Sequence, residues 1–145
     1  MTLTVHSNPI VTGSATPPAA CSGQSVTLDA NSINGSAPYD YTWNGGLGNG
    51  QSHNINPTID FTYTVSVTDA NGCTGEDNVL VSVYDLPNVT ASAFPSALCA
   101  LESGTLSASG SAGTGPYSYT WDNGLGAGQN QFIAPADTTT YTVTI

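Results

Sequence analysis

The side chains of this chain restrict the chemistry that it can perform. Its 145 residues include no Lys or Arg and 10 Asp or Glu, which gives a net charge of −10 at neutral pH. Binding to nucleic acid or to anionic lipid is excluded, because both need basic side chains to neutralise phosphate. A phosphate-binding loop with its Lys, a Schiff-base lysine, an arginine clamp and Lys–Asn isopeptide bonds are excluded for the same reason.

Two local patterns could suggest catalysis or phosphate binding, but neither is complete. Ser52 and His53 are adjacent, yet no Ser-His-Asp set can be assembled around them, and we expect a surface histidine. Residues 45–50 are rich in glycine, but no Lys and no helix follow, so a turn after a strand is expected. Cys/His spacing typical of zinc sites is absent. The sequence therefore predicts no catalytic residues and no cofactor, apart from one candidate calcium site.

That candidate consists of Asp69, Glu76 and Asp77, which lie around one predicted hairpin. Carboxylate oxygens are the ligands that Ca²⁺ prefers in proteins. No EF-hand loop or repeated Asp-x-Asp pattern accompanies them, and scattered acids commonly form an ordinary solvated surface. A calcium site and plain surface charge both stay open.

An internal repeat organises the chain. Many identical residues lie 78 positions apart, including Cys21 and Cys99, Trp43 and Trp121, and Tyr63 and Tyr141. From this spacing we expect residues 1–7 to be the last strand of a preceding repeat, residues 8–85 to be a complete repeat, and residues 86–145 to be a second repeat that lacks its final strand.

Within each repeat, apolar and polar residues alternate with the period of a β-strand, and no helical period occurs. Asn71-Gly72 between two such runs is a strong hairpin signal. Short strands separated by Gly and Pro turns predict an all-β fold of tandem Greek-key sandwiches of the immunoglobulin kind. The expected strands are residues 10–15, 25–30, 39–44, a short pair within 51–60, 61–69 and 78–84. The expected core aromatic residues are Trp43, Tyr63, Trp121 and Tyr141.

The odd number of cysteines requires an explanation. In this topology Cys21 and Cys73 lie at opposite ends of the sandwich, separated by a strand of roughly 23 Å, whereas a disulfide tolerates about 7 Å between Cα atoms. We therefore expect interdomain disulfides, in which Cys21 or Cys99 of one domain pairs with the counterpart of Cys73 in the next. An intradomain bond between Cys21 and Cys73 stays open as the alternative.

The ends of the chain also allow two interpretations. The segment Thr2, Leu3, Thr4, Val5 and His6 aligns with the last strand of the complete repeat. The chain is either a window cut from a longer array, or a protomer that joins its copies head to tail by strand addition. The start shows no signal-peptide pattern, and no apolar run is long enough to insert into a membrane.

The combination of "CSGQSVTLDA", "YTWNGG" and "FTYTVSVTDANGCTGEDNVLVSV" resembles the PKD-like and Ig-like repeats of giant surface adhesins of Bacteroidota, including gliding-motility adhesins and other cargo of the type IX secretion system. The resemblance implies PKD-like sandwiches in an extracellular repeat protein at the bacterial cell surface. It also implies that the module serves adhesion or acts as a stalk.

From these observations we expect a non-catalytic structural or adhesive repeat of an extracellular filament or giant adhesin. Its expected partners are neighbouring repeats or protomers, with surface glycans as a further possibility. The alternative is a carbohydrate-binding or spacer module of a secreted hydrolase. Short acceptor patterns also suggest glycosylation at Asn34, Asn88 and Thr138.

Overall fold

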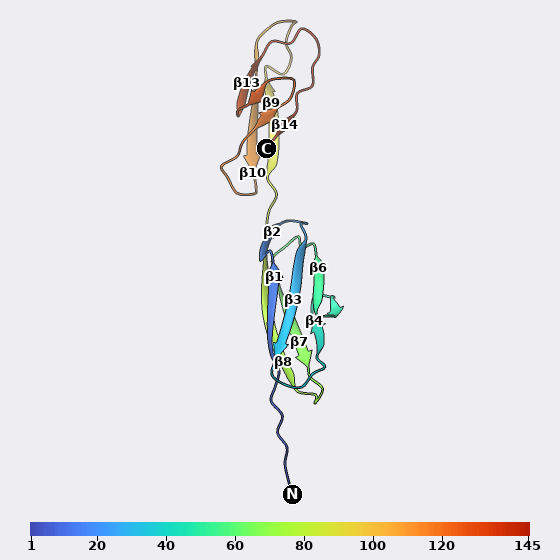
Figure 1. The fold of residues 1–145 in the computed structure, drawn as a ribbon. Coiled ribbons are helices and arrows are strands. Elements are labelled where there is room, and N and C mark those ends of the chain that lie inside the picture. Colours follow the sequence, from blue (N-terminus) through green and yellow to red (C-terminus); the bar gives the residue numbers. More distant parts are fainter. The chain divides into compact units, whose positions relative to one another are not determined.

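The computed structural model describes all 145 residues, which form strands joined by turns and bends. The chain is all-β, as the alternating pattern predicted (Figure 1). It divides into two compact units, Met1–Tyr84 and Asp85–Ile145. None of its elements is a helix with the length and hydropathy needed to cross a membrane.

The first unit is a sandwich of two sheets. One sheet has the order β1-β3-β6, and the other has the order β2-β8-β7-β4-β5. The strands are β1 (Ile10–Thr16), β2 (Ala19–Cys21), β3 (Val26–Ile33), β4 (Asp40–Trp43), β5 (Gly48–Asn49), β6 (Ser52–Ile55), β7 (Phe61–Thr68) and β8 (Thr74–Tyr84). All pairings are antiparallel except that of β2 with β8.

The core of this unit follows directly from the period of two. In β7, Tyr63, Val65 and Val67 point inward and are buried, while Thr64 and Ser66 lie between them on the outer side. The inward residues of both sheets meet in one apolar cluster. Its fully buried side chains are Val26, Leu28, Val65, Val67 and Val81. Burial of each such side chain stabilises the fold by about 1.5–3 kcal/mol.

Several strands differ from the sequence expectation. β3 extends to Ile33, and of the short pair expected within residues 51–60 only β6 lies there, because β5 falls at Gly48–Asn49. β8 begins at Thr74 rather than near residue 78, because its polar first half completes a hydrogen-bonded ladder with β7 that needs no apolar pattern. β2 was not predicted, since three small residues carry no periodic signal. After Pro17 and Pro18 the chain leaves β1 and pairs with β8 in the opposite sheet.

The second unit has a similar arrangement of two sheets, without a counterpart of β8. Its sheets have the orders β13-β10-β9 and β12-β11-β14. The strands are β9 (Asn88–Phe94), β10 (Gly104–Ser111), β11 (Thr120–Trp121), β12 (Gly126–Ala127), β13 (Asn130–Ile133) and β14 (Val143–Thr144). Its buried core consists of Leu106, Ala108 and Trp121. No strand in the unit corresponds to β8, because Ile145 aligns with Val67, before the position where β8 begins.

Candidate functional site

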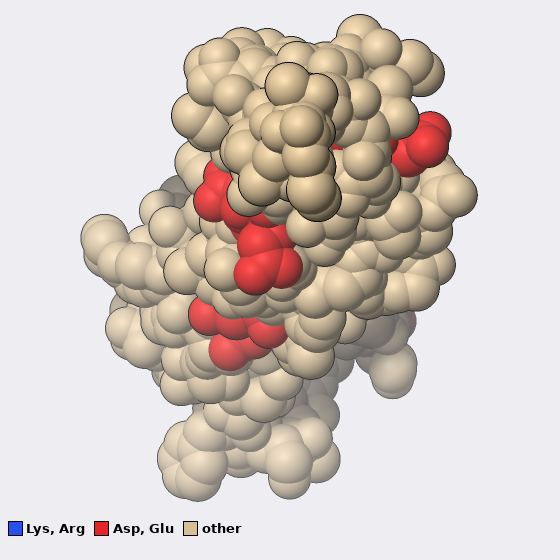
Figure 2. Space-filling view, turned by 90° about the horizontal axis from the view of Figure 1, so that it is seen from below, with Lys and Arg blue, Asp and Glu red and all other residues tan.

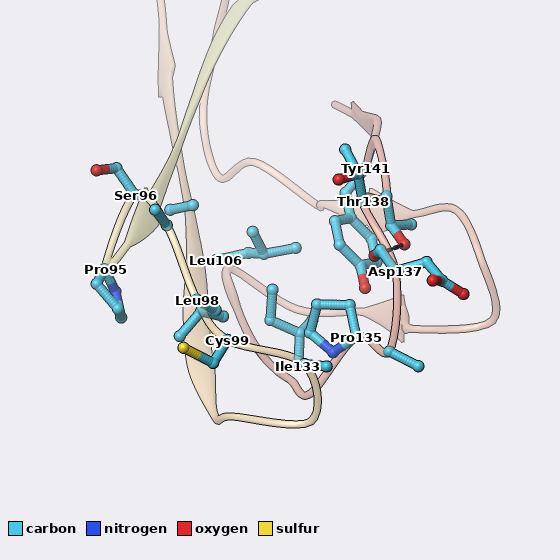
Figure 3. Close-up of a pocket in the computed structure, with 15 residues that line it drawn as sticks. Pro95, Ser96, Leu98, Cys99, Leu106, Ile133, Pro135, Asp137, Thr138 and Tyr141 are labelled. Carbon is cyan, nitrogen blue, oxygen red and sulfur yellow. Dashed lines mark hydrogen bonds between the residues drawn. The ribbon is translucent and has the colours of Figure 1, made fainter.

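A groove of about 560 Å³ lies in the second unit. Leu98 and Cys99 line it from one side and Thr138 and Tyr141 from the other, with Leu106 between them (Figure 3). Its lining includes the apolar side chains of Leu98, Leu106 and Ile133 and one acid, Asp137. Its lining residues are Ala93, Pro95, Ser96, Ala97, Leu98, Cys99, Ala100, Leu106, Ile133, Pro135, Ala136, Asp137, Thr138, Thr139 and Tyr141.

The first unit shows why this groove exists. There, β8 lies between β2 and β7 and covers the floor of the sandwich. The counterparts of β2 and of the first half of β7 in the second unit are residues 97–99 and 139–142, and neither segment is a strand. Ile55 is 7% exposed in the first unit, whereas its counterpart Ile133 is only half-buried. The groove is thus the place that β8 fills in the first unit.

The cysteines occupy the opposite ends of β8 in the first unit. Cys21 pairs with Tyr84 at the end of β8, and Cys73 immediately precedes its first residue, Thr74. The 11 residues of β8 are separated by ten steps that span roughly 33 Å, so this fold excludes a bond between Cys21 and Cys73. All three cysteines are free in the structure, with Cys99 exposed and the other two half-buried. Interdomain disulfides therefore stay a prediction.

Asp69 has a structural role that the sequence did not reveal. It is buried, and its Oδ2 accepts a hydrogen bond from Ser36 N at 2.9 Å. Its Oδ1 accepts bonds from Asn71 N at 2.9 Å and Cys73 N at 2.8 Å. Burial by itself raises the pKa of Asp69, but these three N–H groups, together with the charge of His6, outweigh it and hold the pKa below its ordinary value. The carboxylate therefore closes the hairpin between β7 and β8.

Of the other two acids of the candidate calcium site, Asp77 makes a separate hydrogen bond and Glu76 makes none. Asp77 Oδ2 accepts a hydrogen bond from Gly13 N at 2.8 Å, which ties β8 to β1. Glu76 makes no side-chain hydrogen bond that would bring it to Asp69. The structure contains no group of three or more His, Cys, Asp or Glu side chains that could hold a metal ion. Calcium at this hairpin thus stays a prediction of the sequence, without support from the geometry.

The expected core aromatic residues lie in equivalent places in the two units. Trp43 and Trp121 are 3% and 4% exposed. Their Nε1–H groups donate to the carbonyl oxygens of Gly50, at 3.0 Å, and Gly128, at 2.9 Å. Each tryptophan thus joins the apolar core to the glycine-rich turn that follows its strand.

The two tyrosines differ. Tyr63 is buried beside β8, whereas Tyr141 is half-buried and forms one wall of the groove. This difference follows from the absence of a β8 counterpart in the second unit.

His53 is not the free surface histidine that the sequence suggested. Its ring packs edge-on against Trp43, with the ring centroids 6.4 Å apart, and its Nε2 is buried without a hydrogen-bond partner. The counterpart Gln131 donates from its amide to Ala127 O at 3.0 Å. The position therefore supports the turn around the tryptophan in both units.

The remaining predicted sites are all exposed. Asn34, Asn88 and Thr138 are accessible to modification, and Thr138 also lines the groove. The proposed strand donor, Thr2 to His6, is exposed and pairs with no strand. Figure 2 shows Asp and Glu among uncharged residues on the face it presents, with no basic residue there.

Sequence reasoning did not find the groove or a second, smaller hollow of about 250 Å³ beside Phe61 and Tyr63. The rings of these residues lie 4.7 Å apart. The position of a hollow depends on how strands distant in the sequence pack together, so no local residue pattern predicts it. The 78-residue repeat was the one available signal for the groove, because it showed that the second copy stops before its last strand.

Comparisons with known proteins support the repeat character of the chain. Residues 94–126, which lie in the second unit, match the model of the SprB repeat. This match, which covers less than half of the chain, supports the resemblance to a family of cell-surface repeats. The matched segment contains Cys99 and Trp121, two of the residues that carry the internal repeat.

A solved structure to which this chain is similar is that of the three N-terminal domains of the highly immunogenic outer capsid protein (Hoc) of bacteriophage RB49. It is 16% identical, with a TM-score of 0.46 over 94% of this chain. The chain spans 52% of the length of that structure. No curated protein matched the sequence.

Proposed function

We propose that this chain is a non-catalytic structural or adhesive repeat module of an extracellular filament or giant surface adhesin. The observation that carries the proposal is the SprB-repeat match within a unit that is repeated in the chain at a spacing of 78 residues. The proposal includes a PKD-like character of the domains, export as cargo of the type IX secretion system, and a place on the bacterial cell surface.

The composition supports an exposed location. A chain without Lys or Arg offers no cleavage site to trypsin-like proteases. Its net charge of −10 makes copies repel one another at low ionic strength, and salt weakens that repulsion. Both properties suit a filament surrounded by proteases and salt.

The proposal also includes head-to-tail joining by strand addition and by interdomain disulfides. Cys21 and Cys73 lie at opposite ends of the first unit, so neither can pair within it. A cysteine at each end is the arrangement that would link successive domains of an array. Cys99 occupies the place of Cys21 in the second unit.

Surface labelling of intact cells tests the proposed function. Antibody against this chain is applied to cells that make the protein natively, before and after lysis, with a cytoplasmic protein as the control. We expect labelling of intact cells and loss of the signal after treatment with a protease of broad specificity, but not after trypsin. Labelling that requires lysis would overturn the proposal.

A further inference from the structure

We propose that the outer face of the sheet β9-β10-β13 binds a neutral, extended polysaccharide, with Phe94 and Phe132 packed against two of its sugar units. The inference rests on the adhesive role in the proposed function, and it names the surface and the ligand class that would serve that role. The three strands lie side by side (Figure 1) and correspond to the whole of the sheet β1-β3-β6. Since β8 belongs to the other sheet, the lack of a β8 counterpart leaves this face complete.

The strand register places the two aromatic rings in one row across the sheet. Thr105 of β10 pairs with Phe94 of β9 on one side and with Phe132 of β13 on the other. Residues paired in this way point to the same face of a sheet. Leu106, which follows Thr105, is buried in the core, so the row lies on the outer face. Two strand spacings separate the Cα atoms of the phenylalanines by about 10 Å.

Both rings are exposed to solvent. Phe94 is 81% exposed and Phe132 is 83% exposed, and neither belongs to the apolar cluster of the unit. The same two positions are exposed in the first unit, where they hold Thr16 and Asn54. These positions are therefore at the surface in both units, and only the second unit places aromatic rings there.

Polar groups lie between and beside the two rings. In the first unit the Thr27 hydroxyl donates to Asn54 Oδ1 at 2.8 Å. Phe132 stands in the place of Asn54 and offers no acceptor, so the hydroxyl of Thr105, the counterpart of Thr27, is left for another partner. The next row of the same face adds the hydroxyl and amide groups of Ser92, Ser107 and Asn130.

This alternation of rings and polar groups fits the chemistry of a sugar chain. A pyranose ring presents C–H groups on its faces, which pack on the electron-rich face of an aromatic ring, and hydroxyl groups at its edge. A lipid or an apolar protein surface needs a continuous apolar patch, which two rings on either side of a threonine do not form. An extended β-linked chain presents its ring faces at regular intervals along a line, so the row can contact two units of one chain.

The charge of the face favours a neutral ligand. The strands β9, β10 and β13 contain no Asp or Glu, although the whole chain has a net charge of −10. In the first unit, by contrast, Asp29 of β3 takes the place of Ser107. The chain has no Lys or Arg to pair with an anionic polysaccharide, and its own charge repels one. The same repulsion disfavours a second copy of this chain as the occupant.

The experiment measures retardation of the purified 145-residue chain in native gels that contain hydroxyethylcellulose or glycol chitin, two neutral β-linked polymers. We expect retardation that increases with polymer concentration. The double variant Phe94→Thr, Phe132→Asn places the residues of the first unit in the row and should migrate as it does without polymer. Each single substitution should weaken binding by about tenfold, because one ring contact is lost.

The matched control removes exposed apolar side chains from the same face of the first unit. Ile10 and Ile33 pair with each other there and are 53% and 60% exposed. The variant Ile10→Thr, Ile33→Thr should be retarded as strongly as the original chain. Because Phe94 and Phe132 are outside the core, the unfolding transition reported by Trp121 fluorescence should be the same in the double variant, which shows that the second unit stays folded.

Two further measurements test the ligand class and the row itself. Carboxymethylcellulose has the same backbone as hydroxyethylcellulose but carries negative charge, so it should retard the chain less at low ionic strength. Adding Thr16→Phe and Asn54→Phe to the double variant builds the row on the first unit and should restore retardation by the neutral polymers.

The inference would be overturned if neither neutral polymer retards the chain, or if the double variant is retarded as strongly as the original. Stronger retardation by carboxymethylcellulose contradicts the neutral ligand, and a folded graft that is not retarded contradicts the aromatic row. Sedimentation showing association that Phe94→Thr, Phe132→Asn abolishes would identify the face as a contact between copies instead. These measurements use purified protein, so surface labelling of cells can succeed while polysaccharide binding fails, and the reverse.

Discussion

The two units are built from the same sequence pattern and yet differ in the depth of their cores. In the first unit, the apolar cluster joins residues from both sheets and includes Val79 and Val81 of β8. In the second, the buried apolar cluster is limited to the side chains of Leu106, Ala108 and Trp121. The tryptophan and its hydrogen bond to the following glycine-rich turn are the same in both.

The difference shows how much of the fold depends on one strand. β8 pairs with β2 and β7 and packs on β1, so its presence makes neighbouring segments into strands. β7 runs over Phe61–Thr68, whereas its counterpart β14 is limited to Val143–Thr144. The strand that carries the tryptophan thus forms in both units, whereas β2 and the full length of β7 form only in the unit where β8 pairs with them.

The largest expected effect tests whether the two cores are independent. Trp43→Ala should lower the free energy of unfolding of the first unit by about 3–5 kcal/mol, because it removes a buried indole and leaves a cavity. Denaturant unfolding followed by Trp121 fluorescence should leave the transition of the second unit unchanged. Trp43→Phe, which keeps most of the apolar volume, is the matched control. A shift of the Trp121 transition would show that the two units unfold together.

The next effect tests whether the missing strand accounts for the shallow core. Extending the chain after Ile145 with the sequence of residues 68–84 should stabilise the second unit by about 3 kcal/mol, since the counterparts of Val79 and Val81 become buried. Trp121 fluorescence in the Trp43→Phe background measures the midpoint. An extension with Ser at these two valine positions is the control. If both extensions give the same midpoint, burial of the strand is not the cause of the difference.

A smaller effect is expected where β1 crosses β8. A Cβ on Gly13 would lie 2.4 Å from Cγ2 of Val79, so Gly13→Ala should destabilise the first unit by about 1–3 kcal/mol. The counterpart in the second unit is Ala91, which is exposed and has no such strand above it. Ala91→Gly should therefore change the second transition by less than about 1 kcal/mol. Equal effects of the two substitutions would contradict the packing of β1 on β8.

The smallest expected difference between the two units is in how their stability depends on pH. The folded-state pKa of Asp69 is lowered, so the stability that its carboxylate contributes is fully present above the unfolded pKa of about 3.9. It is lost as the pH falls through the lower folded pKa. The first unit should therefore lose stability over this range relative to the second, which has no counterpart of Asp69 within Asp85–Ile145. Asp69→Asn should lower the midpoint at neutral pH and remove this part of the pH dependence, as measured by thermal melting from pH 2 to 7.

The alternation of apolar residues predicted the strands of the first unit well where they are half-buried. β1, β3, β4 and β7 lie within three residues of their expected ranges. β2 and the first half of β8 were missed, because small or polar residues give no period of two and are held by pairing with a neighbour. The role of Asp69 was missed for a related reason. Its three N–H donors come from two segments, near residue 36 and after residue 69, that only the folded chain brings together.

The sequence by itself determined the all-β class, the 78-residue repeat, the position of the two core tryptophans and the exclusion of chemistry that needs Lys or Arg. These properties depend on composition and on local periodicity, which do not require contacts between distant segments. The tertiary structure decided which segments become strands at the sheet edges, why Cys21 and Cys73 cannot bond to each other, and where the groove lies. Each of these depends on whether β8 or a counterpart is present between its two neighbours, and pairing across the sheet is a long-range interaction that no local pattern records.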